Sequence, residues 1–162
     1  MAPPPIGEIE MNLEHVTRWI KSFSRSADEA VSYYAEDFDF ADYPLEQFIR
    51  NDKAALRRAF LPFANQDPSS GFGIHEFSVD EYIGNKDAGL ILFSWKATHC
   101  GTFFGLPVKD DREIVTNGMT YHIYRNGKIA REIVHSDQIH VVQQLGYPVE
   151  IAHFWEDPAF GR

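Results

Sequence analysis

Residues 94–107 read SWKATHCGTFFGLP and contain the end of an apolar strand followed by an aromatic turn. Just before this end, an apolar residue stands at every second position from Ile91 to Ala97, which is typical of a strand with one buried face. His99 has the same strand parity and is expected to point inward, and Gly101 then interrupts the pattern. The stretch therefore predicts that a long strand brings an imidazole and several aromatic rings to one end of a sheet.

Further strand patterns surround this stretch. The sequence predicts strands over about residues 74–83, 89–100, 112–125 and 128–136. Asn126-Gly127 is a strong signal for a type I′ hairpin between the last two of them. A short helix should follow at residues 138–145, ended by Gly146.

The first third of the chain has helical patterns instead. Asn12 should cap a helix that ends near residue 25, and Ser26 with Glu29 forms a capping-box pattern that opens a second helix. A third helix is expected from an Asn51 cap to about residue 64, with its end distorted by Pro62. Between the last two, residues 38–44 suit a short edge strand ended by proline. Helices followed by a meander of long strands predict an α+β fold with a curved antiparallel sheet.

Length and composition limit the class of protein. The chain has 162 residues and a formal net charge of −9, so no basic surface for nucleic acid or an anionic membrane is expected. The single cysteine, Cys100, excludes an intramolecular disulfide and a cysteine-based zinc site. The sequence has neither a secretory signal pattern nor an apolar run of about 18 residues, which predicts a cytoplasmic protein.

The domain organisation follows from where the patterns begin and end. Residues 1–11 contain three consecutive prolines and are expected to form an extended arm. Residues 12–146 should form a single domain, and residues 147–162 a tail. Thirteen Phe, seven Tyr and three Trp supply side chains that pack a core or line a small-molecule pocket.

Asp137 is the first candidate for acid–base chemistry. It stands at the end of the last predicted strand, where a desolvated carboxylate would have a raised pKa and could transfer a proton near neutral pH. Asp at a strand-to-helix junction is more often an N-cap, here of the helix at residues 138–145. The two roles are compatible.

His99 has two readings as well. It could donate a hydrogen bond to an oxyanion or act as an acid–base partner, but a lone histidine on an apolar strand face is more often a core residue bonded to a backbone carbonyl. Asp42, before Tyr43-Pro44, is a further candidate acid, and its simpler interpretation is a turn carboxylate in solvent. The spacing of the histidines matches no metal site.

The pairing of the last two predicted strands determines on which face of the sheet the side chain of Asp137 lies. Counting outward from the hairpin pairs Thr116 with Asp137 and places Asp137 on the face of Thr120 and Ile133. The opposite face, with Tyr121 among others, looks equally apolar, so one face should be covered by helices and the other by a second subunit. The residues leave open which face is which, and a β-bulge would reverse the assignment.

Three segments together resemble the SnoaL-like polyketide cyclases, which belong to the superfamily shaped like nuclear transport factor two and ketosteroid isomerase. They are Trp95 with Thr98–Pro107, Asn126–Ile129, and Asp137 with Gln143–Gly146. The resemblance spans residues 12–146. Its most specific parts are the T-H-x-G…F-x-G segment and the D…Q-Q-L-G ending.

This resemblance implies a fold and an activity. The fold is a curved antiparallel sheet wrapped around helices as a cone-shaped α+β barrel with a deep apolar pocket. The activity is a cofactor-independent intramolecular aldol ring closure, with the family's catalytic aspartate at Asp137 and its active-site histidine at His99. The chain departs from the family at Ser136, where tryptophan is common, at His135, where an acid is usual, and in the loop 108–112. The family substrate is therefore not transferred.

The leading hypothesis is a cyclase or isomerase that acts on a polyketide-like or polycyclic carbonyl compound. Asp137 would move a proton next to the carbonyl and His99 would stabilise the enolate oxygen. The pocket would be lined by Trp95, Tyr121, Phe104 and Trp19, together with Asp42. We expect no cofactor and no metal, an apolar carbonyl substrate, and a homodimer or homotetramer.

Two alternatives remain. In the first, Asp42 is the base, in the manner of the ketosteroid isomerases, and Asp137 is structural. In the second, the protein is a non-catalytic module that binds a small molecule or a partner protein.

Overall fold

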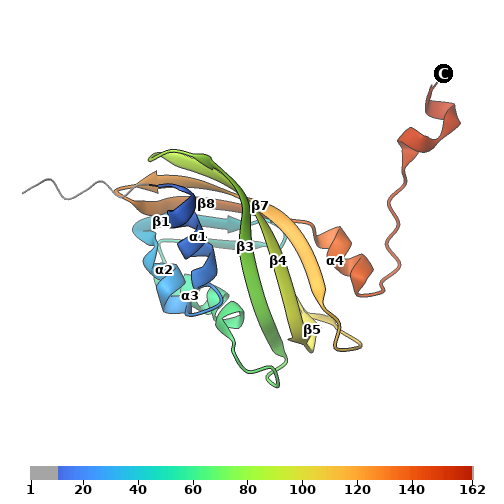
Figure 1. Ribbon diagram of the computed structural model, residues 1–162, viewed down its shortest axis with the longest axis horizontal. Coiled ribbons are helices and arrows are strands. Elements are labelled where there is room, and N and C mark those ends of the chain that lie inside the picture. Colours follow the sequence, from blue (N-terminus) through green and yellow to red (C-terminus); the bar gives the residue numbers. More distant parts are fainter. Residues whose placement is uncertain (1–10, 162) are drawn as a thin grey trace, which may run out of the picture.

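The computed structural model describes residues 11–161 and shows helices packed against one face of a curved sheet (Figure 1). The first half contains α1 (Leu13–Ser22), α2 (Ala27–Ser32), β1 (Tyr34–Asp42), β2 (Gln47–Arg50), α3 (Lys53–Phe60) and the 3-10 helix η1 (Leu61–Ala64). The second half contains β3 (Phe72–Gly84), β4 (Ala88–Cys100), β5 (Thr102–Phe103), β6 (Leu106–Pro107), β7 (Ile114–Arg125), β8 (Lys128–Ser136) and α4 (Gln138–Gln144), followed by the 3-10 helices η2 (Phe154–Glu156) and η3 (Pro158–Gly161). The α+β architecture and the four long strands are confirmed.

Within these residues the main sheet has six strands in the order β2-β1-β8-β7-β4-β3. All neighbours are antiparallel except β1 and β8, which run parallel. The prediction of an edge strand at residues 38–44 is wrong, because β1 lies between β2 and β8. After Pro44 the chain turns back and adds β2, which is the edge strand instead.

The hairpin between β7 and β8 has the predicted turn and one irregularity beyond it. Asn126 and Gly127 both have positive φ, as a type I′ turn requires. Arg125 pairs with Lys128, but the register then shifts so that Ile123 pairs with Arg131, which leaves Ala130 as an extra residue. From this bulge onward, the side chains of β8 alternate in the opposite sense to a regular hairpin.

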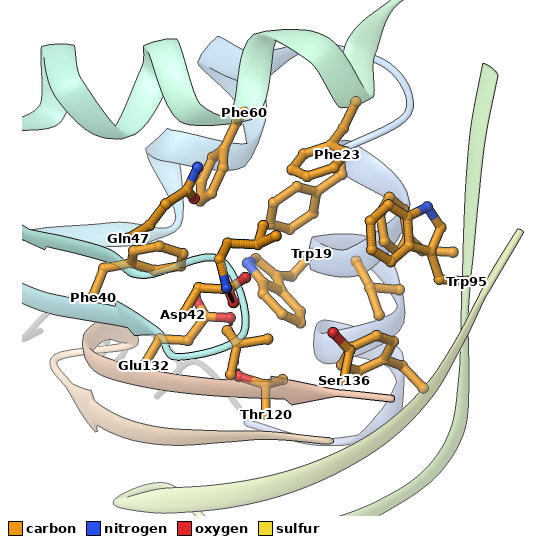
Figure 2. Close-up of a pocket in the computed structure, with 16 residues that line it drawn as sticks. Trp19, Phe23, Phe40, Asp42, Gln47, Phe60, Trp95, Thr120, Glu132 and Ser136 are labelled. Atoms are coloured by element: carbon orange, nitrogen blue, oxygen red, sulfur yellow. Dashed lines mark hydrogen bonds between the residues drawn. The ribbon is translucent and has the colours of Figure 1, made fainter. Parts of the chain in front are cut away.

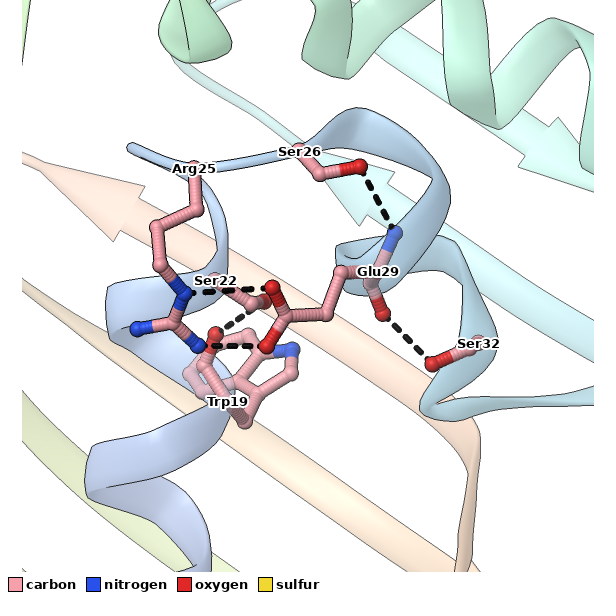
Figure 3. Close-up of polar contacts among 6 residues, drawn as sticks. All are labelled: Trp19, Ser22, Arg25, Ser26, Glu29 and Ser32. Atoms are coloured by element: carbon pink, nitrogen blue, oxygen red, sulfur yellow. Dashed lines mark hydrogen bonds and ion pairs between the residues drawn. The ribbon is translucent and has the colours of Figure 1, made fainter.

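The first two helices begin at their predicted caps. Asn12 accepts a hydrogen bond from the backbone N–H of His15 at 3.0 Å, and Ser26 accepts one from that of Glu29 at 3.3 Å. Figure 3 shows that only half of the capping box forms, because the Glu29 carboxylate binds the guanidinium of Arg25, whose Nε lies 3.1 Å away. An ion pair with Arg25 thus replaces the second cap.

The third helix differs at both ends from its prediction. Asp52, rather than Asn51, caps it by accepting from the backbone N–H of Ala55 at 2.8 Å, and Asn51 has a φ of +54° outside the helix. At the other end the chain tightens into η1, with Pro62 in its first turn. The distortion expected at Pro62 is confirmed.

The core lies between the helices and the concave face of the sheet. Val16, Trp19 and Ile20 of α1 and its C-cap residue Phe23 are buried, whereas Leu13 is exposed. From β4 the alternate residues between Ile91 and Ala97 are also buried. Side chains from both elements line the cavity.

The opposite face of the sheet and the tail remain exposed. The exposed apolar side chains of β7 are Val115, Met119, Tyr121 and Ile123. A second subunit on this face stays a prediction. Residues 147–161 lead away from the domain (Figure 1), and residues 1–10 of the expected arm lie outside the described part of the chain. Among residues 11–161, no helix is long and apolar enough to cross a membrane.

Candidate functional site

A half-open cavity lies between α1, α3 and the concave face of the sheet. Its volume is about 60 Å³. It is lined by Trp19, Ile20, Phe23, Phe40, Asp42, Leu45, Gln47, Phe60, Phe63, Phe77, Phe93, Trp95, Thr120, Glu132, Val134 and Ser136. Figure 2 shows Asp42, Glu132 and Thr120 gathered at one end of this ring of aromatic side chains, away from Trp95. The cavity thus has an apolar end and an acidic end.

Asp42 is one of the two carboxyl groups at the acidic end. It is the last residue of β1, it is 9% exposed, and its Oδ1 accepts a hydrogen bond from the backbone N–H of Leu45 at 3.1 Å. Desolvation raises the pKa of Asp42 to about 6; the hydrogen bond from Leu45 opposes this rise and the charge of Glu132 adds to it. A carboxyl with this pKa can both accept and return a proton near neutral pH.

Glu132 is buried in the same lining as Asp42, and both of its carboxylate oxygens accept hydrogen bonds. The Tyr34 hydroxyl donates to its Oε2, and the Thr120 hydroxyl donates to its Oε1 at 2.9 Å. Hydroxyl donors thus occupy both oxygens of the Glu132 carboxylate. Nε2 of His122, itself fully buried, lies 3.5 Å from Oε1 and makes no hydrogen bond within residues 11–161. Desolvation, reinforced by Glu132, raises the pKa of Tyr34 well above its ordinary value, so Tyr34 stays a donor.

Two uncharged polar side chains complete the lining. Gln47 of β2 pairs directly with Asp42 across the hairpin, and its amide makes no side-chain hydrogen bond within residues 11–161. The Ser136 hydroxyl accepts from Nε2 of Gln138 at 2.9 Å, which leaves its own proton for another acceptor. Figure 2 shows both side chains at the border of the cavity. They add two neutral donors to the lining that contains Asp42.

Three residues predicted to bind substrate do line this cavity, namely Trp19, Trp95 and Asp42. The indole N–H of Trp95 donates to Nδ1 of His75 at 3.1 Å, while Nε2 of His75 lies 2.9 Å from the carbonyl oxygen of Phe72. Burial lowers the pKa of His75, which keeps this ring neutral. Trp95 is therefore held in place from behind, with its ring against the cavity.

Asp137 does not reach the cavity. It is exposed and caps α4 by accepting from the backbone N–H of His140 at 3.0 Å, so the prediction of an N-cap is confirmed. The reason is the bulge at Ala130, which turns Glu132, Val134 and Ser136 toward the interior in place of the side chains that a regular register would put there. The regular register counted from the hairpin is therefore wrong beyond Ala130, and the bulge reverses the assignment of the faces, as expected for a β-bulge.

The expectation that His99 points inward is also wrong. Its side chain is 46% exposed, and Nδ1 lies 3.2 Å from Oδ1 of Asp111. His99 has a φ of +55°, and Gly73 on the facing strand has a φ of +86°, so the backbone of both strands leaves the extended conformation here. The alternation breaks and Cys100, instead of His99, is buried.

Two predicted pocket residues lie elsewhere. Tyr121 is on the outer face of β7 and is 40% exposed, because the neighbouring inward positions are Thr120 and His122. Phe104 sits in the turn between β5 and β6, where its ring packs against Trp95 and Phe103 at centroid distances of 5.1 and 4.4 Å. It supports the ring of Trp95 from outside the cavity.

The sequence analysis did not identify Glu132 and Gln47 as residues of the cavity lining, or His122 as the buried residue beside Glu132. The signal for Glu132 was a charged residue within the apolar pattern of the last strand, which is costly unless the residue is paired. Gln47 had no signal, because β2 itself was not predicted. Within residues 11–161, no three His, Cys, Asp or Glu side chains are grouped as a metal site would need.

The family model of the SnoaL-like polyketide cyclases matches residues 14–145. Since the match covers most of the chain, this protein belongs to the SnoaL-like polyketide cyclase family. The resemblance seen in the sequence is confirmed.

Solved structures agree on the fold. A protein from Jannaschia sp. CCS1 described as a SnoaL-like polyketide cyclase has a TM-score of 0.64 and 16% identity, over 92% of this chain and 99% of that one. IdmH from Streptomyces antibioticus, described as a polyketide cyclase, has a TM-score of 0.63 and 14% identity, over 82% and 96%. A Catenulispora acidiphila DSM 44928 protein with a ketosteroid isomerase-like fold, in complex with trimethylamine, has a TM-score of 0.64 and 13% identity, over 83% and 94%. No curated protein matches the sequence.

Proposed function

We propose that this protein is a cofactor-independent cyclase or isomerase that moves a proton next to the carbonyl group of a small apolar compound, with Asp42 as the base. The observation that supports this proposal is the Asp42 carboxyl at the acidic end of the cavity, with a pKa raised to about 6. The Catenulispora relative with trimethylamine supports a small molecule as the ligand.

The proposed chemistry needs only proton transfer. Asp42 removes a proton from the carbon next to the carbonyl, and the electron pair moves onto the carbonyl oxygen to form an enolate. In an isomerisation, protonated Asp42 returns the proton to another carbon of the same molecule. In an aldol closure, the enolate carbon forms a C–C bond with a second carbonyl carbon, and the resulting alkoxide takes the proton from Asp42. The amide of Gln47 is placed to donate to the substrate oxygen.

The family resemblance supports a different assignment, with Asp137 and His99 as the catalytic pair. Both side chains are exposed and neither lines the cavity, so that mechanism requires a site other than this cavity. It stays a prediction. The two assignments differ in which aspartate is indispensable, and a single assay separates them.

The assay is hydrogen–deuterium exchange at the carbon next to the carbonyl of 1-indanone, followed by NMR in D2O. Asp42→Asn should slow the catalysed exchange about 1000-fold, the scale of a lost general base. Asp137→Asn keeps an N-cap and should change the rate less than about threefold. The opposite pattern would establish Asp137 as the base. Binding of 1-indanone without exchange in the unmodified protein would instead support a non-catalytic binding module.

A further inference from the structure

We propose that the same cavity binds small organic cations, such as a methylated ammonium group, in preference to neutral or anionic molecules of the same shape. This inference goes beyond the proposed function, because it concerns which charge the cavity accepts and needs no turnover. It rests on the balance of charges around the cavity and on the rings that line it.

The described residues that line the cavity include two carboxylates and no Lys, Arg or His side chain. Both oxygens of Glu132 accept hydrogen bonds from hydroxyl groups, those of Tyr34 and Thr120. Asp42 has only the backbone N–H of Leu45 on Oδ1, and its Oδ2 makes no hydrogen bond within residues 11–161. An ionised carboxylate that is nine-tenths buried and has no counter-charge is costly, and a bound cation supplies that charge.

The rest of the lining suits the outside of a methylated ammonium group. Eight of the lining residues are aromatic, namely Trp19, Phe23, Phe40, Phe60, Phe63, Phe77, Phe93 and Trp95. Aromatic faces attract a cation through the negative charge of their π-systems, and they also remove its methyl groups from water. Several aromatic rings around one point are also how proteins bind choline and methyl-lysine.

The same lining residues should make the cavity selective for the charge of the ligand. A neutral molecule of equal shape keeps the contacts with the rings but leaves Asp42 without a counter-charge. An anion adds repulsion from Asp42 and Glu132, in a protein whose formal net charge is −9. The expected order of affinity is cation, then neutral molecule, then anion.

The affinity for a cation should depend on the protonation of Asp42. Glu132 from β8 is the other charged group in the cavity lining, with His122 from β7 behind it. The lining residues from α1, α3, η1, β3 and β4 are not titratable. Binding should therefore weaken as the pH falls and Asp42 takes up a proton.

The experiment compares three molecules that share a tert-butyl-like head, by isothermal titration calorimetry at constant ionic strength. They are choline, which is cationic, 3,3-dimethylbutan-1-ol, which is neutral, and 3,3-dimethylbutanoate, which is anionic. At pH 7.5 choline should bind about tenfold more tightly than the alcohol, and the carboxylate should bind weakest. For choline, the dissociation constant should rise about tenfold from pH 7.5 to pH 5, since only the ionised form of Asp42 attracts it.

Two variants test whether the Asp42 carboxylate attracts the bound cation. Asp42→Asn should weaken choline binding about tenfold and remove its dependence on pH between 5 and 7.5. Asp39→Asn is the matched control, since Asp39 lies on the same strand with its carboxylate facing Arg50 outside the cavity, and the change in net charge is the same. It should leave choline binding within about twofold, because an exposed charge is screened by salt.

A spectroscopic measurement on the unmodified protein locates the site. Of the three Trp indole N–H signals, those of Trp19 and Trp95 should shift on addition of choline, while that of Trp155 in the tail should not. The proposal is overturned if the alcohol binds as tightly as choline, if Asp42→Asn keeps the pH dependence, or if only Trp155 responds. None of these outcomes depends on exchange with 1-indanone, so the proposed function and this inference can fail separately.

Discussion

Two of the carboxylate–imidazole pairs within residues 11–161 have similar distances but differ strongly in burial. Glu132 and His122 are 3.5 Å apart with side chains 3% and 1% exposed, whereas Asp111 and His99 are 3.2 Å apart with side chains 69% and 46% exposed. The shorter pair lies in water, where charges are screened and the pairing is worth little. The longer pair lies in the core beside the cavity. Burial, more than distance, determines which pair influences the site.

The comparison also shows that a sequence motif can lie away from the cavity. His99 belongs to the T-H-x-G segment that resembles the family, and it is the member of the exposed pair. His122 belongs to no motif and is buried against Trp19, with ring centroids 4.5 Å apart. The imidazole that borders the candidate site is thus the one with no signal in the sequence.

Removing the carboxylate of each pair tests most directly whether burial determines how much the pair contributes to stability. Glu132→Ala should lower the free energy of unfolding by about 3–5 kcal/mol, because it leaves the hydroxyls of Tyr34 and Thr120 buried without their acceptor and removes the carboxylate beside His122. Asp111→Ala should lower it by less than about 1 kcal/mol. Urea unfolding followed by circular dichroism measures both. Equal losses would mean that burial does not separate the two pairs.

A second prediction uses the pH dependence of stability that Asp42 should confer. Its pKa in the folded protein, about 6, is raised above the unfolded value of about 4, so the folded state binds more protons in this window. The free energy of unfolding should therefore fall as the pH rises from about 4 to 6, by up to about 3 kcal/mol. In Asp42→Asn that part of the decline should vanish. A variant that keeps the full decline would assign it to other groups.

The smallest expected effect concerns Asp137 as a helix cap. Asp137→Ala removes the hydrogen bond to the backbone N–H of His140 and should lower the free energy of unfolding by about 1 kcal/mol. Asp137→Ser and Asp137→Asn keep a capping oxygen and should recover most of this loss in the same urea titration. If all three lose equally, the carboxylate has a role other than capping.

Much of the fold could be predicted from local patterns. The strand alternation before Ala97, the Asn126-Gly127 turn, and the caps at Asn12 and Ser26 each depend on neighbours in sequence, and the structure confirms them. The position of β1 inside the sheet was predicted wrongly, because it depends on contacts between residues that are far apart in the sequence. The parallel pairing of β1 with β8 could not be derived from either strand alone.

The candidate site was harder to predict than the fold. One extra residue at Ala130 exchanges the two faces of β8, and the positive φ of His99 does the same at the end of β4. Side-chain period in a strand is two, so each single irregularity reverses an assignment that was correct up to that point. Asp42 and Trp19 were identified because no such irregularity lies between them and the patterns that place them.

The parallel pairing of β1 with β8 has a consequence for how the protein is made. Tyr34 and Glu132, which hydrogen-bond at the acidic end of the cavity, are 98 residues apart in the chain. During synthesis β1 emerges before β8 and has only the short β2 as a partner until β8 leaves the ribosome. The cavity and its acids can therefore assemble only after β8 has been made, and contacts of such long sequence separation favour slow folding. A nascent chain of this protein is expected to need protection of β1 until β8 is available.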